Sequence, residues 1–567
     1  MRHDVIPRAA VLATAAICAT LIWPATVSAQ SDLVSPVLPL DIGPEGAGAP
    51  AASLEDAAVF AWREFIALNW PVKAGRRGVA AEGDSFDAPA SRPRVWETFK
   101  ARVEAYPGTG TPWGEGRAPA DYGFDQPPRY QYSPQKVAGS DAAPGRTVAC
   151  DGRTTTSAPW HNLDEPNHNG GRSGLSPREP FPGQQILMES KVNREHYGYV
   201  AARGWYGERS IRDLRRDTGL YVRTRFEAPP PGKRDRPQAG ELISFPNGAI
   251  EIKAAWRRLA PAEDVSRFFS RPVRYYRSEA GGYCHYDSSD QPEDRWGLLA
   301  LHVMHKTPSA PYFIWATFEQ VDVMLTDERD ATGRPLLAEH ADGTLTEAGA
   351  RVTRPFSPEI EIGPASYEQE QQYRYHATVA QSPQPGPGLY FIPANDNELL
   401  PALPPDTNRV DMRKRLFPTP AIIARINARF QQAIRARHPG SPFQFYRLVS
   451  VQWKPLDKAP GVLYTGPEDP AVYYSSSVII EPPPVHQMFS GQLALGFDTS
   501  TDYVFRELRF LNPPPNPGAP VFNNTHFDGK PFLAGGCMGC HGQRQVYGTD
   551  WSFLLERQRV IEPEVIP

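Results

Sequence analysis

Two stretches of the chain carry the hydrophobic spacing of an amphipathic helix. In residues 53–70 and 419–438, apolar side chains recur every three or four positions. Ser53 with Asp56 three residues later is typical of a capping box, and Pro71 stops this first helix. In the second stretch a threonine–proline pair supplies the N-cap and the first helical position, and a glycine follows the end. Both are therefore predicted to be helices with one buried face.

Most other patterned segments favour β-strands. Strand-like runs are expected at residues 185–192, 219–226, 249–256, 296–306, 312–323, 444–453 and 473–480. The two longest runs, 296–306 and 312–323, are apolar enough to be buried on both faces. Between these segments the chain is rich in loops. The pattern predicts an α+β fold: a loop-rich, mostly β body with a few helices.

Charged residues alternate with apolar ones in two of the expected strands. Glu189 and Lys191 do so in the first, and Glu251 and Lys253 in the second. Such polar faces usually meet water. The alternative is that the four side chains converge in a polar cavity.

The run 296–306 also places its chemically active side chains by strand alternation. His302 and Lys306 fall on one face with Met304, and His305 falls on the other. Because the two histidines point in opposite directions, they do not readily chelate one metal ion.

Composition excludes a collagen-like, a coiled-coil and an intrinsically disordered protein. The 567 residues include 61 prolines and 46 glycines, more than average but below the level typical of disordered chains. Hydrophobic residues make up 40% and aromatic residues 11%, which suffices for sizeable cores. The net charge is −4 with no basic stripe, so we expect no nucleic-acid partner.

The N-terminus has the three parts of a secretory signal peptide. Arg2 and Arg8 precede an apolar stretch, and Val27-Ser28-Ala29 provides small residues for cleavage. A membrane anchor is the alternative, but the apolar stretch of about 15 residues is shorter than the roughly 20 that span a bilayer. We therefore expect residues 1–29 to be removed, the mature chain to be periplasmic or secreted, and no membrane span to remain.

The position of each cysteine in the chain predicts its role. Cys18 leaves with the signal, and Cys150 and Cys284 are expected to pair in an oxidising compartment. Their loop of more than 100 residues would be worth about 4–5 kcal/mol in the chain-entropy model. The alternative is two buried thiols.

The strongest chemical signal lies near the C-terminus, in GGCMGCHGQ. Cys537, Cys540 and His541 form C-x-x-C-H, the pattern of c-type haem attachment. Each thiol can form a thioether with one haem vinyl group, and the adjacent histidine supplies the proximal nitrogen to the iron. The rivals are a thioredoxin-like redox pair, a zinc knuckle and a plain disulfide. No second C-x-x-C exists to complete a zinc site. We expect one covalent haem c.

The sixth iron ligand must come from upstream, because no methionine or histidine follows His541. His526, in FNNTHFDGKP, is close enough in sequence to fold over the other haem face. Met488, the 302–305 group and an open position are the alternatives. A sixth protein ligand favours an electron carrier, whereas an open position favours ligand binding or catalysis.

Three stretches carry a family resemblance: GAIEIKAAWR, LHVMHKTPSAPYFIWATFEQVD and the C-terminal NNTHFDG…GGCMGCHG. With them the chain resembles large bacterial exported mono-haem proteins of the cytochrome c family. In such proteins the stretch before the haem motif often reads Asn-Thr-Thr-Met, whereas Asn523-Asn524-Thr525-His526 stands here. The resemblance thus implies His526 as the ligand, with bis-histidine ligation and a lower potential. It implies no established reaction.

These inferences predict a signal peptide (1–29), an α+β body (30–510), possibly of two subdomains, and a haem c segment (511–567) packed on it. The first functional hypothesis is one-electron transfer with a redox partner protein or a small-molecule electron donor or acceptor. The second is a haem-dependent oxidoreductase with an open distal site acting on peroxide, oxygen or a small organic substrate. His302, His305 and Lys306 are then the candidate distal groups. A third option is a binding protein in which the haem acts as a sensor or holds the structure together. No second cofactor motif is evident.

Overall fold

The structure of the protein is a computed structural model of the whole chain. It describes residues 33–43, 48–89, 91–108, 110–130, 132, 149–150, 158–166, 186–211, 213, 245–259, 264–279, 282–290, 294–324, 337–339, 345–347, 373–376, 388–391, 409–410, 421–453, 477, 479–480, 526–527, 530–531, 537, 541, 550–555 and 565–566. The expected strand at 219–226 and most of the one at 473–480 lie outside these residues, as do Thr419 and Pro420.

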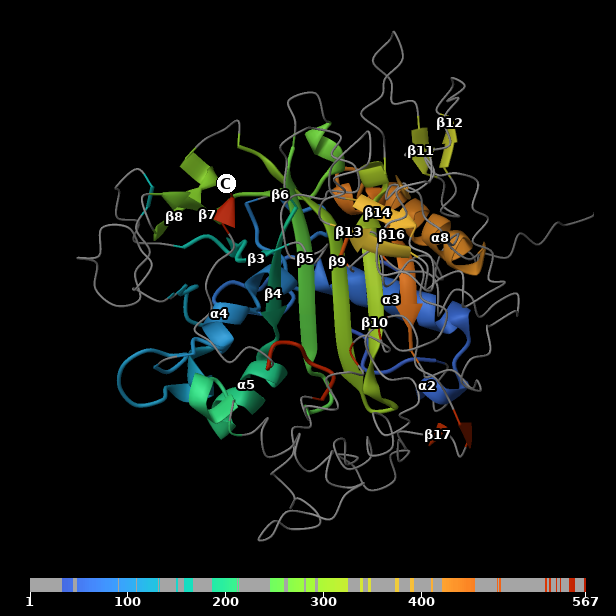
Figure 1. The fold of residues 1–567 in the computed structure, drawn as a ribbon. Coiled ribbons are helices and arrows are strands. Elements are labelled where there is room, and N and C mark those ends of the chain that lie inside the picture. Colours follow the sequence, from blue (N-terminus) through green and yellow to red (C-terminus); the bar gives the residue numbers. More distant parts are fainter. Residues whose placement is uncertain are drawn as a thin grey trace, which may run out of the picture.

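An eight-stranded sheet forms the centre of the molecule (Figure 1). Its path runs β1-β4-β5-β9-β10-β16, and β3 and β6 pair with β4 and β9, all antiparallel. The strands are β1 (Lys100–Ala101), β3 (Glu165–Pro166), β4 (Leu187–Val192), β5 (Ile250–Arg258), β6 (Ser270–Arg271), β9 (Trp296–Thr307), β10 (Ala310–Gln320) and β16 (Tyr446–Gln452). Five of the expected strands, corresponding to β4, β5, β9, β10 and β16, are thereby confirmed.

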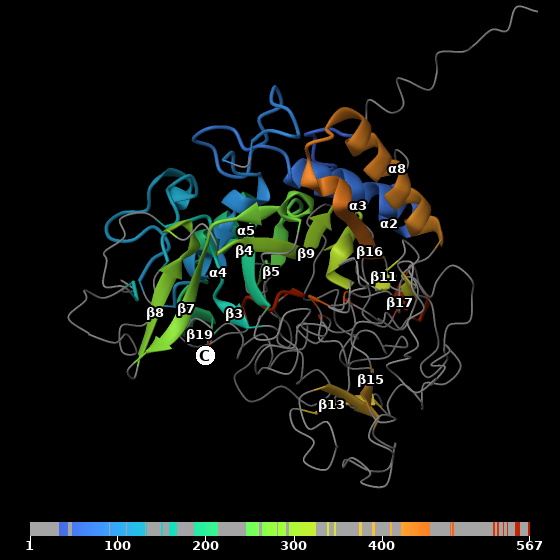
Figure 2. The same cartoon turned by 90° about the horizontal axis from the view of Figure 1, so that it is seen from above.

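Both expected helices are present and lie together over one face of the sheet (Figure 2). They are α3 (Leu54–Leu68) and α8 (Ala421–Arg437). The capping box at Ser53 and Asp56 is formed, as predicted. Short helices complete the list: α2 (Gly48–Ala51), α4 (Arg102–Ala105) and α5 (Arg194–Arg203), with 3-10 turns at Trp96–Thr98, Ala120–Gly123, Val265–Arg267, Ser288–Asp290, Val321–Met324 and Pro442–Phe445.

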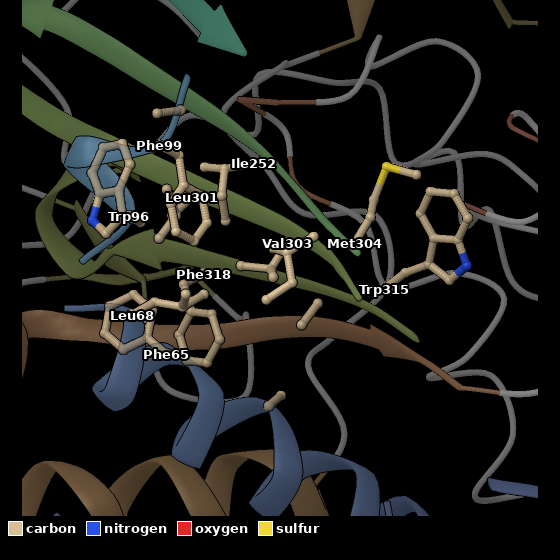
Figure 3. Packing of buried hydrophobic residues seen from close by; sticks show 14 of the residues in the cluster. Phe65, Leu68, Trp96, Phe99, Ile252, Leu301, Val303, Met304, Trp315 and Phe318 are labelled. Atoms are coloured by element: carbon tan, nitrogen blue, oxygen red, sulfur yellow. The ribbon is translucent and has the colours of Figure 1, made fainter. Parts of the chain in front are cut away.

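Aromatic side chains fill the space between the sheet and these helices. Phe65 of α3 stacks on Phe318 of β10 with ring centroids 4.1 Å apart, and Trp62 stacks on Phe430 of α8 at 5.3 Å. In Figure 3, Phe65 and Leu68 of the helix lie against the strand residues of this core. The face of the sheet under α3 is therefore its apolar side.

A second sheet carries the predicted disulfide. It contains β2 (His161–Asn162), β7 (Val273–Glu279), β8 (Gly282–Asp287) and the C-terminal β19 (Val565–Ile566). Cys150 and Cys284 are bonded, with Cα atoms 4.9 Å apart and 134 positions between them in sequence. The expected pairing is confirmed.

The remaining strands form small sheets. They are β11 (Leu337–Glu339) with β12 (Leu345–Glu347), β13 (Tyr373–His376) with β14 (Gly388–Phe391) and β15 (Arg409–Val410), and β17 (His526–Phe527) with β18 (Lys530–Pro531). The mostly β, α+β character of the body is as predicted. Within the described ranges, none of the helices combines the length and apolarity needed to cross a bilayer.

Candidate functional site

Two of the three haem-motif residues belong to the described chain. Cys537 and His541 both have helical backbone, and the Cys537 side chain is buried. Residues four positions apart on a helix share one face. Cys540 lies outside the described residues. The arrangement suits a group held by a thiol and an imidazole from the same side.

His541 is oriented by a backbone carbonyl. Its Nδ1 lies 2.8 Å from the carbonyl oxygen of Trp551. Since a carbonyl can only accept, Nδ1 carries the proton and donates, which leaves the lone pair of the neutral ring on Nε2. A hydrogen bond of this kind orients most metal-binding histidines and makes the other nitrogen more basic. The imidazole therefore has the tautomer that an iron ligand needs.

Aromatic rings enclose the His541 imidazole. The ring centroid of Trp315 lies 4.4 Å away and that of Phe553 lies 4.5 Å away, the latter edge-on. Trp315 stands on β10 directly opposite Met304 of β9, and both side chains project from the face away from α3 (Figure 3). Residues 550–555, drawn in red, lie beneath that same face (Figure 2). The C-terminal residues thus pack on the side of the sheet that the large helices do not cover.

A buried ion pair fastens the segment that follows the motif. Lys306 Nζ lies 2.7 Å from Asp550 Oδ2, and both side chains are almost completely buried. The backbone N–H of Phe245 donates to the same carboxylate oxygen at 2.7 Å. Burial lowers the pKa of Lys306, and the nearby Asp550 carboxylate opposes this shift. Lys306 is thus an anchor for the C-terminal segment.

Glu251 is a proton-holding group close to this anchor. The pKa of its carboxyl is raised to about 8, mainly by burial; a hydrogen bond from Ser552 opposes the rise and the Asp550 charge adds to it. His196 lies beside it, with Nδ1 3.4 Å from Oε1, and burial lowers the pKa of that imidazole to about 3. Near neutral pH the pair is therefore a largely protonated carboxyl next to a neutral imidazole.

The 302–305 group is divided as strand alternation predicts. His305 points to the α3 side, where its Nδ1 lies 2.7 Å from Glu64 Oε1. His302 lies on the His541 side, with 6.4 Å between the two ring centroids. Trp315, however, is 6.1 Å from His302 as well as 4.4 Å from His541. The Trp315 indole therefore neighbours both imidazoles, and iron ligation by His302 stays a prediction.

The expected sixth ligand is only partly described. The backbone of His526 forms β17, paired with β18 through His526 and Pro531. The position of its side chain lies outside the described structure, and so does Met488. Ligation by His526 stays a prediction.

The expectation that the alternating charges on β4 and β5 meet water was wrong for three of the four residues. Glu189, Lys191 and Glu251 are buried, because both strands lie inside a sheet that is covered on both faces. Nor do the four converge. Lys191 is paired with Ile252, and Lys253 with Ser190. Cross-strand partners share a face, so Glu189 and Lys191 point to one side and Glu251 and Lys253 to the other.

Glu189 belongs to a buried ionic cluster that the sequence did not reveal. His161 contacts Glu189 through Nδ1 at 2.6 Å and Glu97 through Nε2 at 2.7 Å. Arg271 also pairs with Glu97, at 2.6 Å. Burial would raise the pKa of Glu97, but Arg271 and His161 hold it well below its usual range. Each charge is matched by a partner, so the cluster is a structural network joining the two sheets.

Sequence reasoning also missed Trp315, Asp550, Trp551 and Phe553. The only sequence signal for the last three is the TDWSF run shortly after the motif. In the part of the chain that the structure describes, no three His, Cys, Asp or Glu side chains form a group that could hold a metal ion. A haem iron does not need such a group, because it takes a single nitrogen from the motif.

Comparison with known proteins gave no match to a protein family, a curated protein or a solved structure. The function is therefore inferred from the residues of the chain itself.

Proposed function

We propose that the protein is an exported mono-haem c-type cytochrome that transfers one electron at a time. The haem is bound covalently through Cys537 and Cys540, with His541 as the proximal iron ligand. The observation that carries the proposal is the hydrogen bond from His541 Nδ1 to the Trp551 carbonyl, within a C-x-x-C-H motif. It fixes the tautomer and the ring orientation that such a ligand requires.

The chain's own residues supply binding and environment. When bound, haem c supplies an iron that changes between the ferrous and ferric states. Trp315 and Phe553 pack on the His541 ring and help to hold its orientation. We assign the second axial position to His526, which would leave the iron without an open coordination site and favour electron transfer over chemistry on a bound substrate.

Compartment and partners follow from the same proposal. Residues 1–29 direct export and are removed, which places the mature chain in the periplasm or outside the cell. The Cys150–Cys284 disulfide is compatible with an oxidising compartment. Residues 511–567 form the haem segment on the body 30–510. The body binds a redox partner protein or a small-molecule electron donor or acceptor.

Optical spectra of the purified protein, oxidised and reduced, test this function. A low-spin haem that does not bind added carbon monoxide is expected. A high-spin haem that binds carbon monoxide would instead favour the haem-dependent oxidoreductase with an open distal site. A protein without haem would refute both.

A further inference from the structure

The residues that present the carbonyl to His541 have an unusual backbone. Asp550 and Trp551 have φ angles of 48° and 69°, in the left-handed region that non-glycine residues seldom enter. Two such residues in succession persist only where the surroundings hold them, and they gather at functional sites. The orientation of the Trp551 carbonyl therefore depends on what restrains Asp550.

Lys306 is a side chain that restrains Asp550. Its Nζ donates to Asp550 Oδ2 at 2.7 Å, from a residue 244 positions away in the sequence. Lys306 is itself fixed in the sheet, since its backbone N–H donates to the Ala249 carbonyl and its own carbonyl accepts from Gly248. The ammonium group thus links the end of β9 to the turn beside His541.

Stability alone does not account for such a pair. Taking two charges out of water cancels most or all of the attraction between them, so a buried ion pair adds little to stability compared with apolar residues of similar size. Its directional bonds, in contrast, fix geometry. Lys306 and Asp550 are 1% and 0% exposed, and Asp550 directly precedes Trp551, whose carbonyl orients His541.

We propose that Lys306 is a positioning residue for the haem iron, acting through Asp550 and the Trp551 carbonyl on the orientation of His541. The inference rests on the proposed function. Lys306 does not contact the iron in this account. Its bond to Asp550 keeps the turn in the left-handed conformation, and the turn keeps the imidazole plane in one orientation.

Haem-methyl proton shifts of the oxidised holoprotein test this inference, because they report the orientation of the axial imidazole plane. Asp550→Ala and Lys306→Met both remove the bond and are expected to change the shift pattern. Asp550→Asn removes the charge but keeps an oxygen that accepts from Lys306 and from the Phe245 N–H, so the wild-type pattern is expected. Identical changes in Asp550→Asn and Asp550→Ala would show that charge alone acts and would overturn the inference.

Lys100→Met is the matched control. Lys100 is also a buried lysine paired with a carboxylate, Glu104 at 3.2 Å, but it stands on β1 at the edge of the main sheet. The shift pattern is expected to stay unchanged. If Asp550→Ala does not fold, the haem-methyl shifts of Lys306→Met are compared with those of Lys100→Met. Equal shift patterns in these two variants would overturn the inference. A chain that carries no haem would refute the proposed function itself.

Discussion

The Nδ1 atom of His541 donates to the carbonyl oxygen of Trp551 across 2.8 Å, although the two residues are ten positions apart in the chain. The bond connects the haem motif to the turn that Lys306 anchors in the sheet. A short C-terminal motif is thereby oriented by the large body. For the haem that we propose, this contact gives the large body a role in orienting the iron ligand.

Replacing His526 tests the proposed second axial ligand. His526→Ala is expected to convert a low-spin haem into a high-spin haem that binds carbon monoxide, because the iron loses its sixth ligand. Optical spectra with and without carbon monoxide measure the change. His376→Ala, on strand β13, serves as the histidine control and should keep the wild-type spectrum. An unaltered spectrum in His526→Ala would remove His526 from the iron site.

Removing the disulfide should cost stability without altering the haem. Cys150→Ala with Cys284→Ala opens a loop of 134 positions, and the free energy of unfolding is expected to fall by about 2–5 kcal/mol. Urea denaturation of wild type and double variant, both with haem bound, measures this difference. An equal unfolding midpoint would show that the crosslink is not a source of stability. A changed haem spectrum would show that the disulfide influences the iron site, against expectation.

Glu251 makes stability fall as the pH rises. Its pKa is about 8 in the folded protein and about 4.5 in an ordinary setting, with burial as the main cause. The contribution of a carboxyl whose pKa is raised by folding is fully present below pH 4.5 and is lost as the pH rises through 8. Between these values wild type should lose up to about 1.4 kcal/mol per pH unit relative to Glu251→Gln.

Thermal or urea unfolding at pH 5, 6.5 and 8 compares the two proteins. Only Glu251→Gln lacks the titrating group, so the difference between the two curves isolates it from every other ionisable residue. Parallel stability curves over this range would refute a raised pKa for Glu251.

The aromatic core under α3 should be highly sensitive to truncation. Phe65 is completely buried against Phe318, so Phe65→Ala is expected to lower the free energy of unfolding by about 3–5 kcal/mol. Val37, with 66% of its surface exposed, provides the control: Val37→Ala should change stability by less than about 0.5 kcal/mol. Similar effects for both substitutions would contradict the packing described for this face.

The sequence predicts elements whose signals are local. Ser53 and Asp56 predict the start of α3. The length of the apolar runs at β9 and β10 indicates that these strands are buried on both faces. The Cys150–Cys284 bond is predicted by counting the thiols of a chain that is expected to be exported, and the structure contains it. In each case the information lies within a few neighbouring residues or in a small set of chemically distinctive ones.

Long-range pairing of charges could not be predicted in the same way. Alternating Glu189 and Lys191 resemble a strand that faces water. Their burial is compensated by their own ion pair at 3.5 Å and by partners distant in sequence, such as His161 for Glu189 and the Glu97 carbonyl for Lys191. Arg271 meets Glu97 across 174 positions, and Lys306 meets Asp550 across 244. Such pairs depend on the order of the strands in the sheet, which no local pattern specifies.

The most direct test of the account is covalent haem attachment to Cys537 and Cys540. Protein exported in a host that attaches haem c should be extracted with acid acetone and then examined as its reduced pyridine haemochrome and by intact mass. The haem is expected to stay with the protein, and the mature chain, without residues 1–29, is expected to gain the mass of one haem. A variant with Cys537→Ala and Cys540→Ala should gain none. Haem released into the acetone, or a wild-type chain without added mass, would contradict the account.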